Sequence, residues 1–331
     1  MIRIAIVGLG WWGKQIVTCL KGSGRFQVVA GCDLNPSPLA AFATEHGFDL
    51  TDDYPALLGR GDIDAVAVVT PHTLHEAQVL AAFAAGKHVF CEKPLALSTA
   101  SAGRMLAACA AAGSTLGIGH ERRYEPAMEA VQGLAASGAL GRLMHIDANV
   151  SHDLFRAVDP ANWRLSTESA PAGAMTALGI HLTDLCIAIG GKPVRVAART
   201  ARHVFAEPAH DYLSLGIDFA GGVSARVTCL SATPFYGRFT VYGDKGWIEV
   251  TEAANVDKGL PSTLTHVDAS GKRQSRAFEA QNTVLANFEA WADAIAGRAP
   301  YRFTPEQLRA NVAVLEAVVS SAANDGAPAT L

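Results

Sequence analysis

The chain opens with Ile4-Ala5-Ile6-Val7-Gly8-Leu9-Gly10-Trp11-Trp12-Gly13, and this stretch decides its fold. An apolar strand runs into the pattern Gly-x-Gly-x-x-Gly, which opens a helix. In this context Gly8 permits a tight turn, Gly10 lets the backbone approach a pyrophosphate, and Gly13 permits close helix packing. The helix N-terminus also favours an anion. A glycine turn without a ligand is the alternative, but its surroundings favour a dinucleotide site.

A carboxylate follows the next predicted strand. Asp33 comes directly after Phe26-Gln27-Val28-Val29-Ala30-Gly31-Cys32, at the offset from the last glycine at which an acidic residue binds a ribose hydroxyl pair. A carboxylate there would repel a 2′-phosphate, and Leu34-Asn35-Pro36-Ser37 supplies no cation, so NAD is favoured over NADP. The alternative is that Asp33 only caps the next helix. Trp11 and Trp12 either cover the adenine or pyrophosphate of the cofactor or pack on the sheet.

Length and composition indicate a folded protein of two domains. The 331 residues exceed the usual ~100 to 200 residues of one domain. A net charge of −4 without a Lys/Arg run argues against nucleic acid as a partner. No signal peptide or long apolar segment is evident, which predicts a cytoplasmic protein without a membrane span. The six cysteines lack a CxxC pair, so we expect buried thiols and neither disulfides nor a metal site.

Strands and helices alternate in the first 120 residues. Such alternation implies parallel strands with right-handed crossovers, and therefore a doubly wound Rossmann sheet in an NAD(P)-binding domain at 1–120. The predicted strands are 2–7, 26–32, 64–69, 87–91 and 115–119, and the predicted helices are 11–22, 36–47, 72–85 and 98–112.

The pattern changes after residue 120. Neighbouring strands joined by glycine-containing turns predict an α+β domain at 121–331, built on a large open, mainly antiparallel sheet. We expect this domain to bind substrate. Its open sheet would leave an apolar face, which favours a homodimer or homotetramer. The predicted strands are 142–150, 193–201, 211–219, 223–231, 238–242 and 246–250, and the predicted helices are 126–137, 173–189, 282–296 and 305–323.

Four further segments complete a family pattern. They are Thr70-Pro71-His72-Thr73-Leu74-His75, Ala85-Gly86-Lys87-His88-Val89-Phe90-Cys91-Glu92-Lys93-Pro94-Leu95, Gly179-Ile180-His181-Leu182-Thr183-Asp184 and Val241-Tyr242-Gly243-Asp244-Lys245-Gly246. With the glycine motif, the chain resembles the Gfo/Idh/MocA oxidoreductases over nearly its whole length. The resemblance implies a Rossmann domain followed by a domain with a large open sheet. It also implies oxidation or reduction of a carbinol on a sugar, cyclitol or related polyol.

By this resemblance Lys93 lies beside the nicotinamide and the reacting hydroxyl, and Glu92 helps to hold the lysine or the cofactor. An ammonium group there can stabilise a developing alkoxide or, once neutral, accept its proton. The alternative is a surface lysine that pairs with Glu92. The loop that lines the nicotinamide half comprises Thr70, Pro71, His72 and His75.

His181 matches the family histidine that faces the reacting carbinol, and a neutral imidazole can exchange a proton near pH 7. Asp184 lies three residues later on the same helix face, where it could orient the ring or bind a substrate hydroxyl. Relatives commonly carry Asp four residues before this histidine, and this chain has Ala177. Thr176 or Asp184 are possible substitutes. A structural helix histidine is the alternative.

The remaining candidates rest on position in the family pattern. Each could instead be structural or solvated. The resemblance implies cofactor contacts for Arg122 and Arg164, and substrate contacts for Lys93, Arg123, Tyr124, His152, Arg164, Thr176, His181 and Asp184.

The leading hypothesis is an NAD(H)-dependent dehydrogenase or reductase of a sugar, cyclitol or polyol, in which Lys93 and His181 handle the proton. One alternative is an enzyme that keeps NAD bound and uses transient oxidation for elimination or glycoside cleavage. Another is a binding protein that senses NAD without catalysis, although such a protein needs neither Lys93 nor His181.

Overall fold

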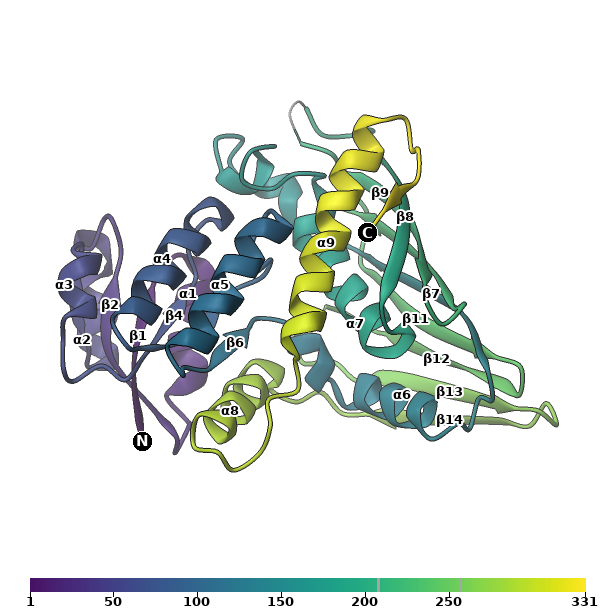
Figure 1. Ribbon diagram of the computed structural model, residues 1–331, viewed down its shortest axis with the longest axis horizontal. Coiled ribbons are helices and arrows are strands. Elements are labelled where there is room, and N and C mark those ends of the chain that lie inside the picture. Colours follow the sequence, from purple (N-terminus) through teal and green to yellow (C-terminus); the bar gives the residue numbers. More distant parts are fainter. Residues whose placement is uncertain (207–208, 256–257) are drawn as a thin grey trace. The chain divides into compact units, whose positions relative to one another are not determined.

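The computed structural model describes residues 1–206, 209–255 and 258–331, and the chain divides into two compact units (Figure 1). Unit 1 comprises Met1–Glu121 and Asn282–Pro305, and unit 2 comprises Arg122–Gln281 and Glu306–Leu331. Unit 2 begins at Arg122, and the late segment from Asn282 to Pro305 clusters with unit 1.

Unit 1 is built on a parallel sheet with the strand order β3-β2-β1-β4-β5-β6. The order reverses beside β1, and open sheets of this kind bind ligands at the carboxyl ends of the strands at such a switch point. The strands are β1 (Ile2–Val7), β2 (Phe26–Cys32), β3 (Asp49–Thr51), β4 (Ala65–Val68), β5 (His88–Cys91) and β6 (Leu116–Ile118). The helical segments are α1 (Trp11–Leu20), η1 (Ser37–Leu39), α2 (Ala40–His46), α3 (Tyr54–Leu58), η2 (His72–Leu74), α4 (His75–Ala84), α5 (Thr99–Ala111) and α8 (Thr283–Ile295).

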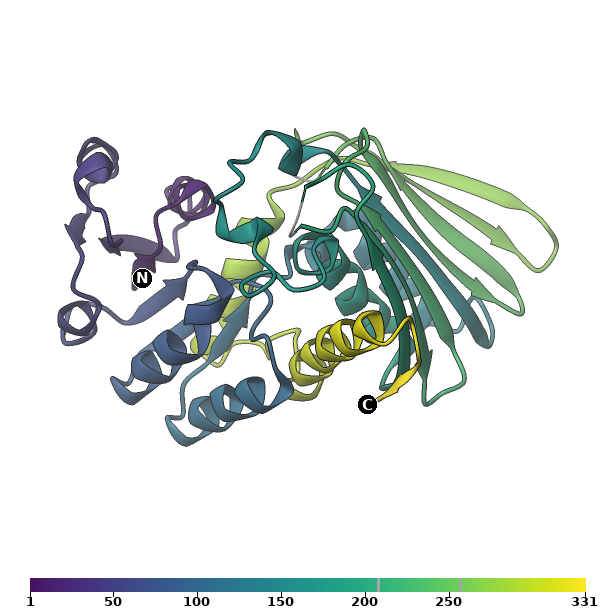
Figure 2. The ribbon, with the colours of Figure 1, turned by 90° about the horizontal axis from the view of Figure 1, so that it is seen from above.

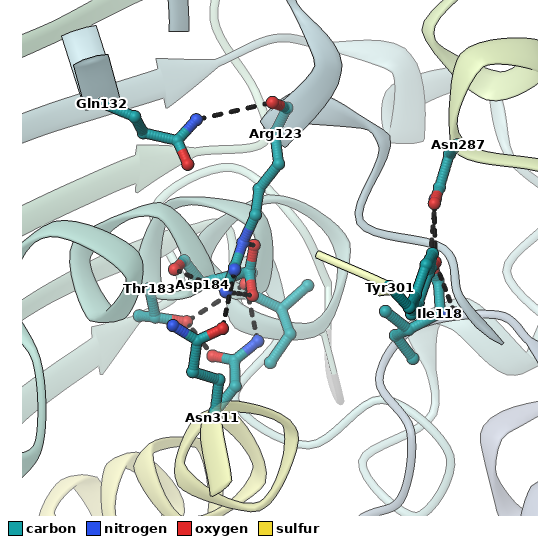
Figure 3. A network of polar contacts seen from close by, with 10 residues as sticks. Ile118, Arg123, Gln132, Thr183, Asp184, Asn287, Tyr301 and Asn311 are labelled. Atoms are coloured by element: carbon teal, nitrogen blue, oxygen red, sulfur yellow. Dashed lines mark hydrogen bonds and ion pairs between the residues drawn. The ribbon is translucent and has the colours of Figure 1, made fainter. Parts of the chain in front are cut away.

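Helix α8 belongs to unit 1 although it comes late in the chain. The Phe288 ring stacks on Phe90 with centroids 3.9 Å apart, and Trp291 stacks on Phe26 at 5.9 Å. Asn287 donates to the carbonyl oxygen of Ile118 at 2.7 Å, as the right-hand part of Figure 3 shows. The apolar face of α8 predicts that the helix is buried, but it does not identify the sheet on which it packs.

Unit 2 contains a nine-stranded sheet with the order β14-β13-β12-β11-β7-β10-β9-β8-β15. Its pairings are antiparallel except for β7 and β10, which run parallel. The α/β fold class and the mainly antiparallel second sheet are therefore confirmed. The strands are β7 (Leu143–Ser151), β8 (Pro193–Ala201), β9 (Tyr212–Phe219), β10 (Ser224–Leu230), β11 (Tyr236–Gly243), β12 (Gly246–Glu252), β13 (Ser262–Asp268), β14 (Arg273–Phe278) and β15 (Ala329–Thr330).

The helices of unit 2 gather on one face of its sheet. Helix α9, in yellow, runs along that face in Figure 2, and Ser321 on this helix accepts from the backbone N–H of Ala198 on β8 at 2.8 Å. Strand residues alternate between this buried side and the opposite side, as in β9 and β10. The helical segments are η3 (Glu121–Tyr124, which begins in unit 1), α6 (Pro126–Ala136), η4 (Leu154–Ala157), η5 (Trp163–Leu165), η6 (Met175–Gly179), α7 (Ile180–Gly190) and α9 (Pro305–Ala323).

The opposite face of the nine-stranded sheet is mixed, because Tyr242 and Trp247, which pair across β11 and β12, lie on the same face as polar residues. Arg238 on β11 forms an ion pair with Asp147 on β7, and its other guanidinium nitrogen lies 3.8 Å from Glu249 on β12. Neighbouring positions on this face include Asn149 and Thr251. The homodimer or homotetramer expected from an open sheet face stays a prediction.

Some elements escaped prediction because they carry weak patterns. Strands β13 and β14 are rich in Ser, Thr, Arg and Gln, and β14 is exposed along almost its whole length. Strand β3 and helix α3 span too few residues for periodicity to show.

Two kinds of feature are absent from the described ranges. No helix there combines the length and the apolar character that a membrane crossing needs. No group of three His, Cys, Asp or Glu side chains gathers as a metal site would require.

Candidate active site

The glycine loop between β1 and α1 has the geometry that a dinucleotide needs. Gly8 adopts φ = +93°, and a Cβ there would lie 2.8 Å from the carbonyl oxygen of Val69. A Cβ on Gly13 would overlap the carbonyl oxygen of Gly8. Gly10 differs, because a Cβ there would meet no atom within 4 Å. As the N-cap of α1 without a side chain, Gly10 leaves the first N–H groups of the helix to an anion. The loop therefore fits a pyrophosphate.

Asp33 follows β2 at the same edge of the sheet. Its Oδ2 accepts from the N–H of Leu9 at 2.8 Å, and its Oδ1 accepts from the N–H of Asn35 at 3.1 Å. The carboxylate thus holds the glycine loop, a role that the sequence did not reveal. Each oxygen keeps a second lone pair for a ribose hydroxyl. The helix-cap alternative does not hold, since Pro36 and not Asp33 precedes the next helical turn, η1.

The two tryptophans of the glycine loop differ in burial. Trp12 is partly buried and packs against the core of unit 1, while Trp11 is 62% exposed. Their ring centroids lie 5.4 Å apart. Of the two roles considered for these rings, Trp12 therefore has the packing role. Trp11 remains the side chain that could cover a cofactor.

The loop after β4 carries four of the predicted cofactor residues: Thr70, Pro71, His72 and His75. Thr70 donates from its hydroxyl to Gln78 at 2.5 Å. The His75 side chain is fully buried, with Nδ1 2.9 Å from the carbonyl oxygen of Pro94 and Nε2 3.1 Å from that of Thr70. Burial lowers the pKa of His75, so the neutral ring donates to one carbonyl, and we assign the proton to Nδ1 with the shorter contact. His75 therefore bonds the Lys93-Pro94 loop through Nδ1, packs its Nε2 edge against the Thr70 loop, and has no exposed surface for a cofactor.

Lys93 follows β5 at the edge of the sheet that carries the glycine loop, and the Lys93–Pro94 peptide bond is cis. Glu92 is only 8% exposed, and its Oε2 accepts from the backbone N–H of Lys93 at 3.2 Å. Burial and the carboxylate of Glu121 raise the pKa of Glu92 to about 7, although a hydrogen bond from Trp12 and the charge of Lys93 act in the opposite direction. The charge of Lys93 therefore acts on a carboxylate that is itself buried.

Arg123 and Asp184 form a buried ion pair in unit 2, shown in the left-hand part of Figure 3. The guanidinium donates from Nε to Oδ2 at 2.7 Å and from Nη2 to Oδ1 at 2.6 Å, and both side chains are 2% exposed. Nη1 also donates to Gln307 at 2.9 Å. This bidentate contact uses both carboxylate oxygens. The pair holds α7 to the start of unit 2, and the substrate contacts predicted for both residues gain no support from it.

Arg122 and Tyr124 are also enclosed within unit 2. The guanidinium of Arg122 donates to Glu252 at 2.8 Å and lies 3.2 Å from a carboxylate oxygen of Glu125. Tyr124 is 4% exposed, and its carbonyl oxygen accepts from Gln281 at 2.5 Å. Their contacts with cofactor and substrate remain predictions.

A π-helical turn, η6, precedes α7 and carries Thr176 and Ala177. Such turns are rare and often occur at functional sites. The Thr176 hydroxyl donates to the carbonyl oxygen of Gly173 at 3.3 Å, so it is tied to the chain that enters the turn. His181 lies in the first turn of α7 and is 8% exposed. The turn therefore places Ala177 and His181 on one continuous helical segment.

A small hollow in unit 2 gathers Arg164, His210 and Ser231, with Ala177 in its wall. The guanidinium carbon of Arg164 lies 4.4 Å from the ring centroid of Trp163. Ser231 is 2% exposed, and in the described part of the chain neither its hydroxyl nor Nδ1 of His210 has a hydrogen-bond partner. Burial and the charge of Arg202 lower the pKa of His210. The hollow therefore offers neutral hydrogen-bonding groups beside one cation.

His152 follows the end of β7, as predicted. Its backbone N–H donates to Leu230 at 2.9 Å, and its Nδ1 accepts from the N–H of Leu154 at 3.3 Å. The ring lies 5.7 Å from that of Phe155, which lines the hollow. His152 therefore supports the wall of the hollow through its neighbours.

Five residues near these sites were not predicted: Gln78, Gly119, Glu121, His210 and Ser231. Gly119 follows β6, and a Cβ there would overlap both carboxylate oxygens of Glu92. A glycine at a strand end can signal such a close approach. His210 precedes β9 and Ser231 follows β10, so the sequence around Ala177 gives no sign of either residue.

Comparison with known proteins assigns both units. Residues 2–120 match the GFO/IDH/MocA oxidoreductase family with an NAD-binding Rossmann fold, and residues 128–249 match the GFO/IDH/MocA C-terminal domain. The chain is 31% identical over 331 residues to 1,5-anhydro-D-fructose reductase of Ensifer adhaerens, covering 98% of this chain and 97% of the relative. It is 26% identical to D-xylose 1-dehydrogenase [NADP(+)] of Haloarcula marismortui, covering 76% and 72%.

A solved structure supports the same family assignment. GenD2 from gentamicin A biosynthesis, in complex with NAD, is 26% identical, with a TM-score of 0.86 over 100% of this chain and 96% of that one. The glycine loop, the position of Lys93 and these matches agree with one another. The chain therefore belongs to the GFO/IDH/MocA oxidoreductase family.

Proposed function

We propose that the chain is an NAD(H)-dependent dehydrogenase or reductase that acts on a carbinol of a sugar, cyclitol or polyol. Lys93 and His181 handle the proton of the reacting hydroxyl. The relatives support the substrate class, since one is named as a reductase of an anhydrofructose and another as a dehydrogenase of xylose.

One observation carries the proposal. In unit 1 the glycine loop, Asp33 and Lys93 all follow the carboxyl ends of parallel strands, and β1, β4 and β5 are neighbours in the sheet. Strand ends at a switch point are where such sheets bind dinucleotides. A lysine that follows β5 at that edge supports the proposed role of Lys93 beside the nicotinamide.

Lys93 and His181 have different tasks in the proposed reaction. An ammonium group at Lys93 can hold the developing alkoxide, and an amine there can accept its proton. A neutral imidazole at His181 can exchange a proton near pH 7. Ala177 provides no carboxylate at the position where relatives commonly have one. Lys93 therefore carries a larger share of the proton chemistry in this chain.

The residues of unit 1 fit a bound NAD. The amides at the start of α1 would hold its pyrophosphate, and Asp33 would accept from its ribose hydroxyls. When bound, the nicotinamide supplies the acceptor or donor of a hydride. We favour NAD over NADP because Asp33 would repel a 2′-phosphate and the exposed Leu34 that follows brings no charge.

Replacement of Lys93 tests this proposal. Lys93→Met should lower kcat about a thousandfold, the scale of lost acid–base catalysis, while the NAD dissociation constant changes less than about threefold. Turnover is followed by NADH absorbance and NAD binding by calorimetry. Lys192→Met, at an exposed position of unit 2, is the matched control and should leave both unchanged. Turnover retained in Lys93→Met would remove the lysine from the mechanism.

A second candidate is favoured by Ala177 alone. An enzyme that keeps NAD bound and oxidises its substrate only transiently, for elimination or glycoside cleavage, need not share the proton groups of a dehydrogenase. Such an enzyme would convert substrate with catalytic amounts of NAD and without net NADH. Accumulation of NADH in proportion to substrate would eliminate this candidate.

A further inference from the structure

Asp211 holds a loop of unit 2 through its carboxylate. It directly precedes β9, and it is 2% exposed. Its two carboxylate oxygens accept hydrogen bonds from the backbone N–H groups of three consecutive residues in the loop after β8. His203 donates at 2.9 and 3.1 Å, Val204 at 2.6 Å and Phe205 at 2.7 Å. Hydrogen bonds to an ionised acceptor are stronger than neutral ones, so this loop is firmly fastened to Asp211.

The backbone of Asp211 connects the same point to two strands. Its N–H donates to the carbonyl oxygen of Ala201, the last residue of β8, at 3.1 Å. Its carbonyl oxygen accepts from the N–H of Ser231, the residue that follows β10, at 2.9 Å. One buried aspartate therefore sets the relative positions of the loop after β8, the start of β9 and the end of β10.

These segments form part of the hollow described above. Phe205, His210 and Ser231 line it. Phe205 and Ser231 are hydrogen-bonded to Asp211, and His210 precedes it in the chain. Gly173, another lining residue, packs against His210, because a Cβ there would lie 2.2 Å from the His210 carbonyl oxygen. The chain that enters the π-helical turn therefore lies directly on His210.

Two polar atoms of the hollow have no protein partner. Within the described residues, neither the Ser231 hydroxyl nor Nδ1 of His210 forms a hydrogen bond. A buried polar atom in this state costs about 1 to 3 kcal/mol, and native proteins usually satisfy it with water or a ligand. A hydroxyl both donates and accepts, and a neutral imidazole nitrogen does one or the other according to its tautomer. The two atoms together are therefore complementary to an oxygen atom.

We propose that this hollow is a subsite for an oxygen substituent of the substrate, bound by Ser231 and His210, and that Asp211 is the positioning residue that builds it. The subsite rests on the proposed function, and it selects among sugars, cyclitols and polyols by whether they place an oxygen there. A hydroxyl and a carboxylate share this chemistry, and the guanidinium of Arg164 in the lining would favour a carboxylate. Asp211 touches no substrate, since its carboxylate holds the loop.

Removal of one hydroxyl tests the subsite in the full-length protein with NAD. The probes are D-glucose, D-glucuronate, myo-inositol and xylitol, followed by NADH absorbance. For the probe with the highest turnover, Ser231→Ala should raise KM about tenfold, the scale of one hydrogen bond. The kcat should change less than about twofold, because the contact is the same before and during hydride transfer. A larger rise for D-glucuronate than for D-glucose identifies a carboxylate as the occupant, and equal rises identify a hydroxyl. Ser275→Ala on the exposed β14 is the matched control and should leave KM unchanged.

Replacement of Asp211 tests its positioning role. Asp211→Asn leaves one oxygen to accept from the loop where the carboxylate has two. It should raise KM about tenfold with kcat changed less than about twofold, and the double variant with Ser231→Ala should have a KM no higher than the larger single effect. Asp268→Asn is the matched control, because its carboxylate also accepts from backbone N–H groups, of Ser270 at 2.9 Å and Lys272 at 3.1 Å, in an exposed turn. It should leave KM unchanged.

A further measurement does not depend on turnover. In an NMR spectrum of the protein with NAD, the ring signals of His210 should shift when a probe binds, and Ser231→Ala should reduce this shift. A KM within about twofold of wild type in Ser231→Ala would overturn the subsite, and so would His210 signals that no probe shifts.

A wild-type KM in folded Asp211→Asn would overturn the positioning role. If this variant does not fold, Asp211→Glu, which keeps the charge but displaces both oxygens, decides by the same criterion. Failure of the proposed function is separate: it appears as turnover retained in Lys93→Met, whatever the His210 signals do.

Discussion

In unit 1, polar side chains at the carboxyl edge of the sheet are held mainly by hydrogen bonds from backbone N–H groups. In unit 2, the charged side chains near its first residues form ion pairs with other side chains. Asp33 binds the N–H of Leu9, and Glu92 binds the N–H of Lys93. Arg123 instead uses its guanidinium fork on Asp184. The first arrangement keeps acceptor capacity for a ligand. The second uses up donors and acceptors within the fold.

This difference separates two ways of predicting a functional residue from the sequence: by its position after a strand and by its residue type. A residue that follows a strand of a parallel sheet is placed by topology, so its position alone indicates a ligand edge. An arginine or aspartate that is predicted to be functional only from its residue type can instead form an ion pair with a residue far away in sequence. Arg123 and Asp184 are 61 positions apart. The comparison predicts that changes in unit 1 alter NAD binding or turnover, while changes to the paired charges of unit 2 alter stability.

The largest expected effect on stability comes from breaking the buried pair. Arg123→Met should lower the free energy of unfolding by about 3 to 5 kcal/mol, because the carboxylate of Asp184 is left buried without its partner. Urea unfolding followed by circular dichroism measures this loss. Arg195→Met is the matched control, since the Arg195–Asp218 pair has the same 2.6 Å contact but side chains that are 60% and 43% exposed.

The control should lose less than about 1 kcal/mol, as exposed pairs do. If Arg123→Met unfolds like wild type but loses substrate affinity, Arg123 belongs to the site and the comparison between the two units is wrong.

A smaller effect concerns pH and Glu92. Its pKa in the folded chain is raised to about 7 from an ordinary 4.5, so folding favours the protonated form. This contribution is fully present below pH ~4.5 and is lost as pH rises through 7. Glu92→Gln removes the ionisation, and its stability relative to wild type should increase between pH 5 and pH 8 by about 2 to 3 kcal/mol.

Denaturant unfolding at the two pH values measures this change. Glu76→Gln is a control of opposite sign, because Arg104 lowers the pKa of Glu76 at a partly exposed position. An equal stability difference at pH 5 and pH 8 would show that Glu92 is not a buried acid of raised pKa.

The smallest effect concerns cofactor choice. Asp33→Asn keeps one oxygen for the N–H of Leu9 and so preserves the loop, but it removes the charge and one acceptor. NAD should bind about tenfold more weakly, equivalent to ~1.4 kcal/mol, and NADP should be affected less. Calorimetric titration of both cofactors measures this, with the exposed Asp52→Asn as control. Unchanged NAD affinity would contradict the ribose contact.

Much of the fold followed from the sequence because its signals are local. Apolar strands bounded by glycine or aspartate, and the motif from Gly8 to Gly13, predict the Rossmann sheet without knowledge of long-range contacts. The individual contacts of α8 could not be read from the sequence, because Phe288 and Trp291 would pack equally well on many apolar partners. Strands β13 and β14 were missed because their residues hardly alternate in polarity.

The candidate site likewise has parts that the sequence predicts and parts that it does not. The cofactor edge of unit 1 was predictable from strand ends, and the resemblance to a family pointed to Lys93. The position of the Glu92 carboxylate was not predictable, because it depends on the space left by the missing side chain of Gly119. The hollow around Ala177 and Ser231 escaped notice for a similar reason, since its residues come from separate segments without a shared motif.

The most direct test of the central claim is NADH absorbance with the purified protein, NAD and a panel of sugars, cyclitols and polyols. The account predicts that at least one of these compounds drives NADH accumulation in proportion to the substrate consumed. Lys93→Met should abolish this signal. Conversion of substrate without net NADH, or accumulation of NADH that persists in Lys93→Met, would contradict the account.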